Sequence, residues 1–121
     1  MSGSQNHYSN NSAFRNDDAG FHLFGYNNTI KQNDAHNNSI GFICNAKSYN
    51  LFSENVAYNN ERDGFYFCSE DISVVNNTAY GNKNFGMLFY SSIGMNISLN
   101  KVFDNKDGIA LGFQNKSQLN S

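Results

Sequence analysis

The sequence contains no proline and no tryptophan, only two cysteines, and no marked excess of either charge. Two cysteines are too few for a disulfide framework. With 8 basic against 10 acidic residues, the chain lacks the basic patch that nucleic acid or an anionic membrane needs. No apolar run approaches the roughly 18 residues of a membrane span, and the opening MSGSQNHYSNNS lacks the regions of a signal peptide. We therefore expect neither a nucleic-acid nor a membrane partner, and the compartment stays open.

Asparagine is what the chain has in excess, at about a fifth of all residues. So polar a composition is typical of disordered segments. However, the 11 phenylalanines and 7 tyrosines are abundant and regularly placed, as they are in a chain that builds a core. We therefore expect a folded chain.

A short motif recurs along the chain with an almost constant period. Its copies are NSAFRN, NDAHNN, NVAYNN, NTAYGN and NKVFDN, and their leading asparagines are Asn11, Asn33, Asn55, Asn77 and Asn100. A glycine followed by an apolar residue comes three or four positions after the second asparagine of each copy. Such a period is the signature of a repeat architecture.

Within each repeat the apolar residues alternate, which predicts strands separated by turns. Aligned at the period, the apolar residues fall into four columns. These are Phe21, Phe42, Phe65, Met87 and Ile109; Leu23, Cys44, Phe67, Phe89 and Leu111; Ile30, Phe52, Val74 and Ile97; and Ala13, Ala35, Ala57, Ala79 and Val102. Stacking like residues at about 4.8 Å per repeat would bury all four columns in one continuous core.

The asparagines and glycines have a predicted role in this arrangement. A side-chain amide both donates and accepts, so the leading asparagines are expected to bond their counterparts above and below as a ladder. Asparagine also tolerates the left-handed backbone of a tight turn. The glycine before each apolar pair is expected to adopt that backbone at no steric cost.

The predicted fold is all-β: a right-handed, single-stranded parallel β-helix of about five rungs of 22–23 residues, open at both ends. It spans residues 1–121 as one domain, which we interpret as a module or fragment of a longer solenoid, since no capping element is seen at either end. Unpaired strand edges there would favour neighbouring rungs or self-association. The alternative is a leucine-rich repeat, but leucine is scarce and no segment has helical periodicity.

The repeat resembles that of the right-handed parallel β-helix (pectate lyase-like) superfamily. The stretch Ile30–Asn82, with AHNN, SENVAYNNERDGF and NNTAYGN, is most similar to repeats of mannuronan (alginate) epimerases. Copper-associated periplasmic proteins of nitrous oxide reductase maturation share the same type of repeat. The location is unknown from the sequence, and the resemblance alone favours an extracellular or periplasmic one.

The resemblance does not carry a catalytic site with it. The epimerases have an Asp-Pro-His-Glu signature, and this chain contains no proline. The aligned stretch FHLFGYN offers only His22 and Tyr26 as an acid–base pair. An outward position on a strand and a turn explains these two residues better, so we predict no catalytic residue and favour a chain that is not itself an enzyme.

The candidate binding site is the column of rings next to the alanine column. Because the alanines point inward, strand alternation should turn their neighbours outward and stack them along one solvent-facing strip. Such a strip suits the apolar faces of an extended polysaccharide, but aromatic residues on neighbouring strands also stabilise each other without a ligand. The five rings are Phe14, His36, Tyr58, Tyr80 and Phe103.

Neither a metal nor a cofactor is predicted. The acidic residues near the glycine turns (Asp17, Asp18, Glu61, Asp63 and Asp107) do not repeat in one column as a calcium array would. The histidines, cysteines and methionines fall in different columns, so they form no cluster of copper ligands. Cys44 is expected to point into the core and Cys68 outward, so we predict no disulfide between them.

Three functional hypotheses follow. The first is a module that binds or spaces along a polysaccharide through the ring column. The second is a truncated uronan-modifying enzyme, epimerase-like or lyase-like, whose active-site rungs are missing. The third is a purely structural repeat segment.

Overall fold

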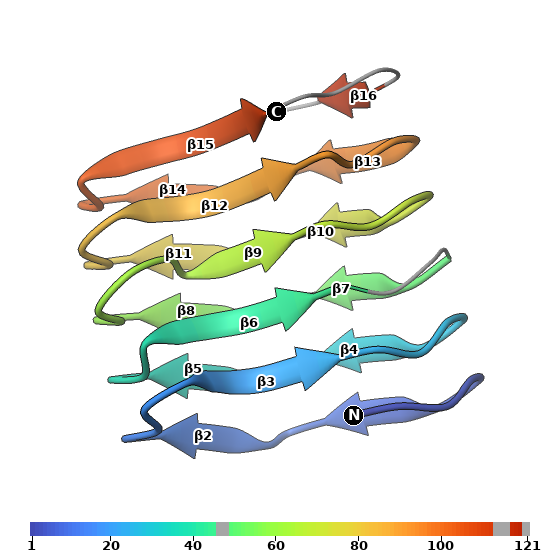
Figure 1. Cartoon of the computed structure of the whole chain (residues 1–121), viewed down its shortest axis with the longest axis horizontal. Coiled ribbons are helices and arrows are strands. Elements are labelled where there is room, and N and C mark those ends of the chain that lie inside the picture. Colours follow the sequence, from blue (N-terminus) through green and yellow to red (C-terminus); the bar gives the residue numbers. More distant parts are fainter. Residues whose placement is uncertain (46–48, 113–116, 120–121) are drawn as a thin grey trace.

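A computed structural model describes residues 1–45, 49–112 and 117–119. The described chain winds into a coil in which each turn contributes one short strand to each of three sheets (Figure 1). All strand pairs are parallel, and no helix occurs among these residues. The all-β solenoid prediction is therefore confirmed, and the helical convex side of a leucine-rich repeat is absent from the described part of the chain.

The three sheets take every third strand of the chain. The first sheet contains β1 (His7–Ser9), β4 (Thr29–Lys31), β7 (Leu51–Ser53), β10 (Ser73–Val75), β13 (Met95–Ser98) and β16 (Ser117–Leu119). The second contains β2 (Ser12–Phe14), β5 (Asp34–His36), β8 (Val56–Tyr58), β11 (Thr78–Tyr80) and β14 (Lys101–Phe103). The third contains β3 (Ala19–Leu23), β6 (Ile40–Cys44), β9 (Phe65–Phe67), β12 (Phe85–Tyr90) and β15 (Asp107–Gly112).

The register of the sheets reproduces the columns read from the sequence. In the second sheet Ala57 pairs with Ala79, and in the third sheet Phe42 pairs with Phe65. Each residue thus lies over its counterpart one rung away, so a period in sequence becomes a straight column in space.

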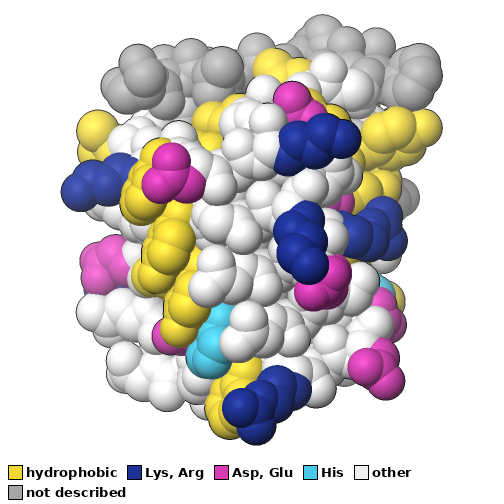
Figure 2. All heavy atoms as spheres, turned by 90° about the vertical axis from the view of Figure 1, so that its left-hand side faces the viewer, with side chains coloured by type: hydrophobic (Ala, Val, Ile, Leu, Met, Phe, Trp, Pro, Cys, Tyr) yellow, Lys and Arg dark blue, Asp and Glu magenta, His cyan; other side chains and the backbone are white. Residues whose placement is uncertain are grey.

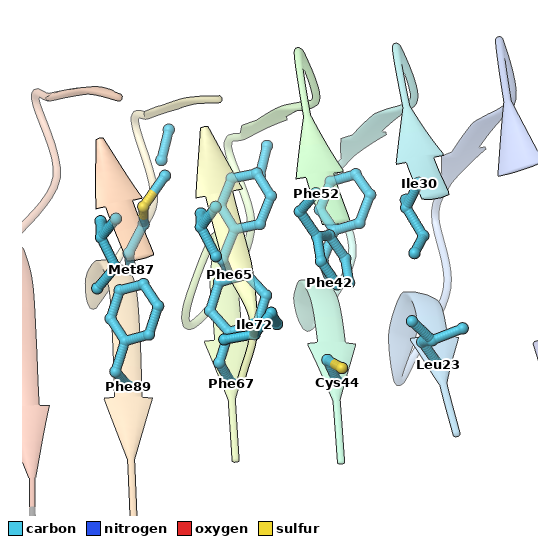
Figure 3. Close-up of a cluster of buried hydrophobic side chains, with 14 of the residues drawn as sticks. Leu23, Ile30, Phe42, Cys44, Phe52, Phe65, Phe67, Ile72, Met87 and Phe89 are labelled. Atoms are coloured by element: carbon cyan, nitrogen blue, oxygen red, sulfur yellow. The ribbon is translucent and has the colours of Figure 1, made fainter. Parts of the chain in front are cut away.

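The core lies inside the coil, between the three sheets, and most of the predicted columns fill it (Figure 3). Phe42, Phe65 and Phe67 are fully buried, and successive phenylalanine rings stack, with 4.7 Å between the centroids of Phe42 and Phe65. The prediction is wrong for Ile109 and Leu111, which are 39% and 44% exposed. Both lie on β15, the edge strand of its sheet, where no described rung covers them.

The leading asparagines form the predicted ladder at the corner between the first and second sheets. The Nδ2 of Asn55 donates to the Oδ1 of Asn77 at 2.9 Å and to the carbonyl of Ile30, one rung on the other side, at 2.8 Å. The same Asn77 Oδ1 also accepts the backbone N–H of Asn55. The bonds run from Asn11 through Asn33, Asn55 and Asn77 to Asn100.

Two further ladders occupy the other two corners. The second asparagines of the motif bond in the same way between the second and third sheets, and Asn60 Nδ2 lies 2.8 Å from Asn82 Oδ1. At the third corner, the N–H of Asn28 donates to the Oδ1 of Asn50 at 2.9 Å. That ladder ends there, because the next two positions of the column are the buried Ile72 and Met95. Sequence reasoning missed both ladders, although the period of 22 residues at this third corner marks its column.

The left-handed backbone conformation occurs one residue before each ladder asparagine. The prediction that the glycine before each apolar pair adopts it is wrong. Glu54, just before Asn55, has a φ of 57°, and Asn59, just before Asn60, has a φ of 54°. The ladder asparagine itself follows the bend, which aims its amide along the coil axis. The three left-handed columns are Gln5, Asn27, Tyr49, Asp71 and Gly94; Asn10, Gln32, Glu54, Asn76 and Leu99; and Arg15, Asn37, Asn59, Gly81 and Asp104.

The repeated glycines serve close approach instead of an unusual backbone angle, which also corrects the prediction. None of Gly20, Gly41, Gly64, Gly86 and Gly108 has a positive φ. A Cβ on Gly64 would lie 2.7 Å from the carbonyl oxygen of Gly86 and 2.8 Å from Asn82 Nδ2. The second asparagine ladder therefore passes so close to Gly20, Gly41, Gly64 and Gly86 that no side chain fits there, whereas a Cβ on Gly108 would meet no described atom within 4 Å.

Candidate functional site

The five predicted rings form one continuous stack on the outer side of the second sheet. The centroids are 5.2 Å apart for Phe14 and His36, 4.8 Å for His36 and Tyr58, 5.0 Å for Tyr58 and Tyr80, and 5.2 Å for Tyr80 and Phe103. The interplanar angles are between 3° and 10°. Figure 2 shows this column of yellow side chains, with one cyan histidine, crossing the face. The outward stack is confirmed, and we call it the ring column.

The ring column presents edges to solvent, whereas its faces are covered. Phe14 and Phe103, at its two ends, are 51% and 48% exposed, and the three rings between them are half-buried. Parallel rings at this spacing cover each other's faces, so an inner ring offers a partner only its C–H edge and its polar tip. Face-to-face stacking of a sugar, which the sequence pattern favoured, is available only at the two terminal rings.

Polar groups flank the ring column on both sides. On the side of the strand, Asp34 Oδ1 lies 3.0 Å from Nδ1 of His36, which orients the imidazole and turns Nε2 away from this bond. On the side of the corner, the guanidinium of Arg15 lies 5.9 Å from the ring centre of Phe14. Burial, with smaller contributions from Asp34 and Tyr80, raises the pKa of the Tyr58 phenol, so this hydroxyl stays protonated and can donate.

A hollow opens at the corner next to the Phe14 end of the ring column. It has a volume of about 450 Å³ and is lined by Arg15, Asn16, Asp17, Asn37, Asn38, Ser39 and Glu61. Every lining side chain carries a hydrogen-bonding group. The lining includes one cation, Arg15, and two carboxylates, Asp17 and Glu61. Such a lining suits a hydroxyl-rich ligand better than an apolar one.

Asp63, one of the acidic residues near the glycine turns, is a buried carboxylate, which the sequence did not predict. It is 1% exposed. Its Oδ1 accepts from the backbone N–H of Phe85 and from Asn84 Nδ2, both at 3.1 Å, while its Oδ2 is buried without a partner. Burial raises the pKa of Asp63, against the opposing effects of these bonds and of Arg62. Nothing in the composition of the turn distinguishes this residue from its exposed neighbours.

The structure does not bring His22 and Tyr26 together as an acid–base pair. The ring of His22 stacks on Phe24 at 4.2 Å, and its Nε2 lies 3.3 Å from Asn45 Nδ2. Tyr26 lies in the following turn, 55% exposed. Outward positions on a strand and a turn, as predicted, describe both residues.

The other candidate ligands are also dispersed. Cys44 is buried and Cys68 is half-buried, and both are free thiols. Within the described ranges, no group of three or more His, Cys, Asp or Glu side chains could hold a metal ion. No helix in that part of the chain is long and apolar enough to cross a membrane.

Together, the parallel coil, its asparagine ladders and its outward ring column define a parallel β-solenoid. The family model of the right-handed β-helix region matches residues 1–120. The chain belongs to this family, which agrees with the predicted handedness. No curated protein sequence matches the chain significantly. The finer resemblance to epimerases or to the copper-associated proteins stays a prediction, because the family match describes only the coil.

Proposed function

We propose that the chain binds an extended polysaccharide along the ring column. The observation that carries this proposal is the straight run of five outward rings parallel to the coil axis. A linear ligand can contact all five, because the distance between successive ring centroids stays between 4.8 and 5.2 Å along the coil. Large contiguous apolar patches on a protein surface often mark interaction sites.

The contacts available define how such a ligand would bind. Sugar C–H groups would lie against the ring edges, and the hydroxyls of Tyr58 and Tyr80 would bond sugar hydroxyls. The flanking Asp34, Arg15 and Asn37 supply further donors and acceptors on either side. Phe14 and Phe103 are the two most exposed rings of the column, so the strongest apolar contacts are expected there.

The hollow beside Phe14 supports a preferred end for the ligand. Its polar lining adjoins the ring column through Arg15, which contributes to both. A chain end or a branch of the polysaccharide would fit there, with hydroxyls bonded by Asn37 and Ser39. This gives the binding surface a direction along the coil.

The test is a titration of the intact chain with alginate, polygalacturonate and neutral glycans, followed by tyrosine fluorescence and by calorimetry. We expect saturable binding to at least one glycan and at least tenfold weaker binding in the Tyr58→Ala/Tyr80→Ala double variant. Tyr58→Phe/Tyr80→Phe keeps the rings and removes the hydroxyls, so it separates the two kinds of contact. Tyr26→Ala is the matched control, because Tyr26 is as exposed as the terminal rings and lies outside the column.

A folded double variant that binds as tightly as the wild type would place the ligand elsewhere. Absence of binding to every glycan would refute the proposal and leave the second candidate, a structural spacer. One observation favours that candidate: the inner rings already cover each other's faces, and such pairs stabilise a sheet by roughly 0.2–1 kcal/mol each without a ligand. The uronan-modifying alternative rests on resemblance alone, and an Asp-Pro-His-Glu signature in a longer reading frame would support it.

A further inference from the structure

We propose that Tyr58 and Tyr80 form a site of oxidative cross-linking, where a dityrosine bond would join two adjacent rungs covalently. This inference is independent of glycan binding. It concerns the pair of tyrosines within the ring column and the chemistry of their phenols.

The geometry holds the two phenols in the arrangement that coupling needs. Tyr58 and Tyr80 are paired directly across β8 and β11, so their side chains leave the sheet side by side. Their ring centroids are 5.0 Å apart at an interplanar angle of 3°. The two phenols are therefore neighbours on adjacent rungs, and rotation of the side chains out of the stack would bring an ortho carbon of one ring to an ortho carbon of the other.

Within the ring column, Tyr58 and Tyr80 are the one pair of adjacent phenols. His36 stacks on the far side of Tyr58 and Phe103 on the far side of Tyr80, and neither can form a phenoxyl radical. The most exposed tyrosines, Tyr26 and Tyr49, lie outside the column. A radical on Tyr58 consequently finds its nearest stacked phenol one rung away in the same chain.

The reaction balances with a peroxide as the oxidant and a peroxidase as its catalyst. Each phenol loses one electron and one proton, and the two phenoxyl radicals combine to form a carbon–carbon bond between ortho carbons. The hydrogen on each bonded carbon then moves to the oxygen through solvent, which restores both aromatic rings. Two phenols thus lose two electrons and two protons in total, and hydrogen peroxide takes these up to give two molecules of water.

Such a bond would reinforce the contact between two neighbouring rungs. Rungs are held together along the axis by hydrogen bonds and packing, and repeat proteins can open between neighbouring repeats. A covalent link between two rungs restricts the conformations of the unfolded chain, as other cross-links do, and so stabilises the folded coil against this opening. The site would serve as an oxidation-dependent lock on the coil.

The experiment treats the dilute, intact chain with peroxidase and limiting hydrogen peroxide and follows dityrosine fluorescence and intact mass. We expect a monomeric product lighter by two hydrogens. Trypsin cleaves after Arg62, so Tyr58 and Tyr80 fall on the separate peptides 48–62 and 63–83, which should be recovered joined. These peptides also contain Tyr49 and Tyr66, so fragment spectra must assign the bond.

Variants provide the decisive comparison. Tyr58→Phe and Tyr80→Phe keep the stacked rings and should each abolish the intramolecular product, while Tyr49→Phe and Tyr66→Phe should leave it unchanged. Prior unfolding in urea should also remove it. A bond that survives Tyr58→Phe, or a product formed only between chains, would overturn the proposal.

Discussion

The side-chain amide nitrogen of Asn55 lies 2.9 Å from the amide oxygen of Asn77, and both side chains are fully buried. Each inner amide of this ladder bonds groups on the rung above and the rung below. The ladder therefore satisfies its own buried polar groups and also those of the backbone at the corner. Loss of one member leaves several buried donors and acceptors without partners.

We predict that Asn55→Ala lowers the free energy of unfolding by at least about 2 kcal/mol, since each buried group left unsatisfied costs roughly 1–3 kcal/mol. Chemical denaturation monitored by circular dichroism measures it. Asn11→Ala is the control, because Asn11 is the exposed first member of the same ladder and its side chain bonds only Asn33. Equal losses for the two variants would show that burial does not set the contribution of the ladder.

Glycine 64 is expected to tolerate no side chain. Gly64→Ala would bring a Cβ within 2.7 Å of the Gly86 carbonyl, and overpacking of this kind costs about 1–3 kcal/mol of stability. Gly108→Ala is the matched control in the same column, because a Cβ there has no described atom within 4 Å. Comparison of the two unfolding curves checks the prediction, which fails if Gly64→Ala is as stable as Gly108→Ala.

Leu99 should be replaceable with a gain in stability. It holds a left-handed φ of 57° while its side chain is 60% exposed, so it has backbone strain and little burial to offset it. Asparagine occupies the equivalent positions 10 and 76 and tolerates this conformation. We expect Leu99→Asn to raise the free energy of unfolding by about 1 kcal/mol and Asn76→Leu to lower it similarly. A thermal melt of both variants that shows no change in either direction would contradict this account.

Asp63 should give the chain a component of stability that increases on acidification. Burial raises its pKa in the folded state, so the folded chain binds this proton more tightly than the unfolded chain does. This contribution is complete below the ordinary aspartate pKa and is lost as the pH rises through the raised one. Relative to Asp63→Asn, the wild type should therefore become more stable as the pH falls from neutral.

The measurement is a series of denaturation curves of the two proteins across that pH range. The difference between them removes the contribution of the other carboxylates, which both proteins share. A wild type that loses stability relative to Asp63→Asn on acidification would mean that the hydrogen bonds from Phe85 and Asn84 outweigh burial.

Sequence reasoning succeeded where the period alone decides the outcome. Residues one period apart become neighbours in register, so the core phenylalanines, the leading asparagine ladder and the ring column could all be predicted. It failed where an outcome depends on position within a rung. The prediction that Gly64 and its counterparts adopt a left-handed backbone is wrong, because the bend falls at residues such as Glu54 and Asn59 instead.

The sequence by itself determined the architecture of this protein: the strands, their parallel stacking, and which side chains share a column. Only the tertiary structure decided how each column is used. The three corners set the backbone angles, and the close passage of the ladders excludes side chains at the glycines. The same packing buries one acidic residue, Asp63, among exposed neighbours. It also turns the edges of the aromatic rings toward solvent, because rings held at rung spacing cover each other's faces.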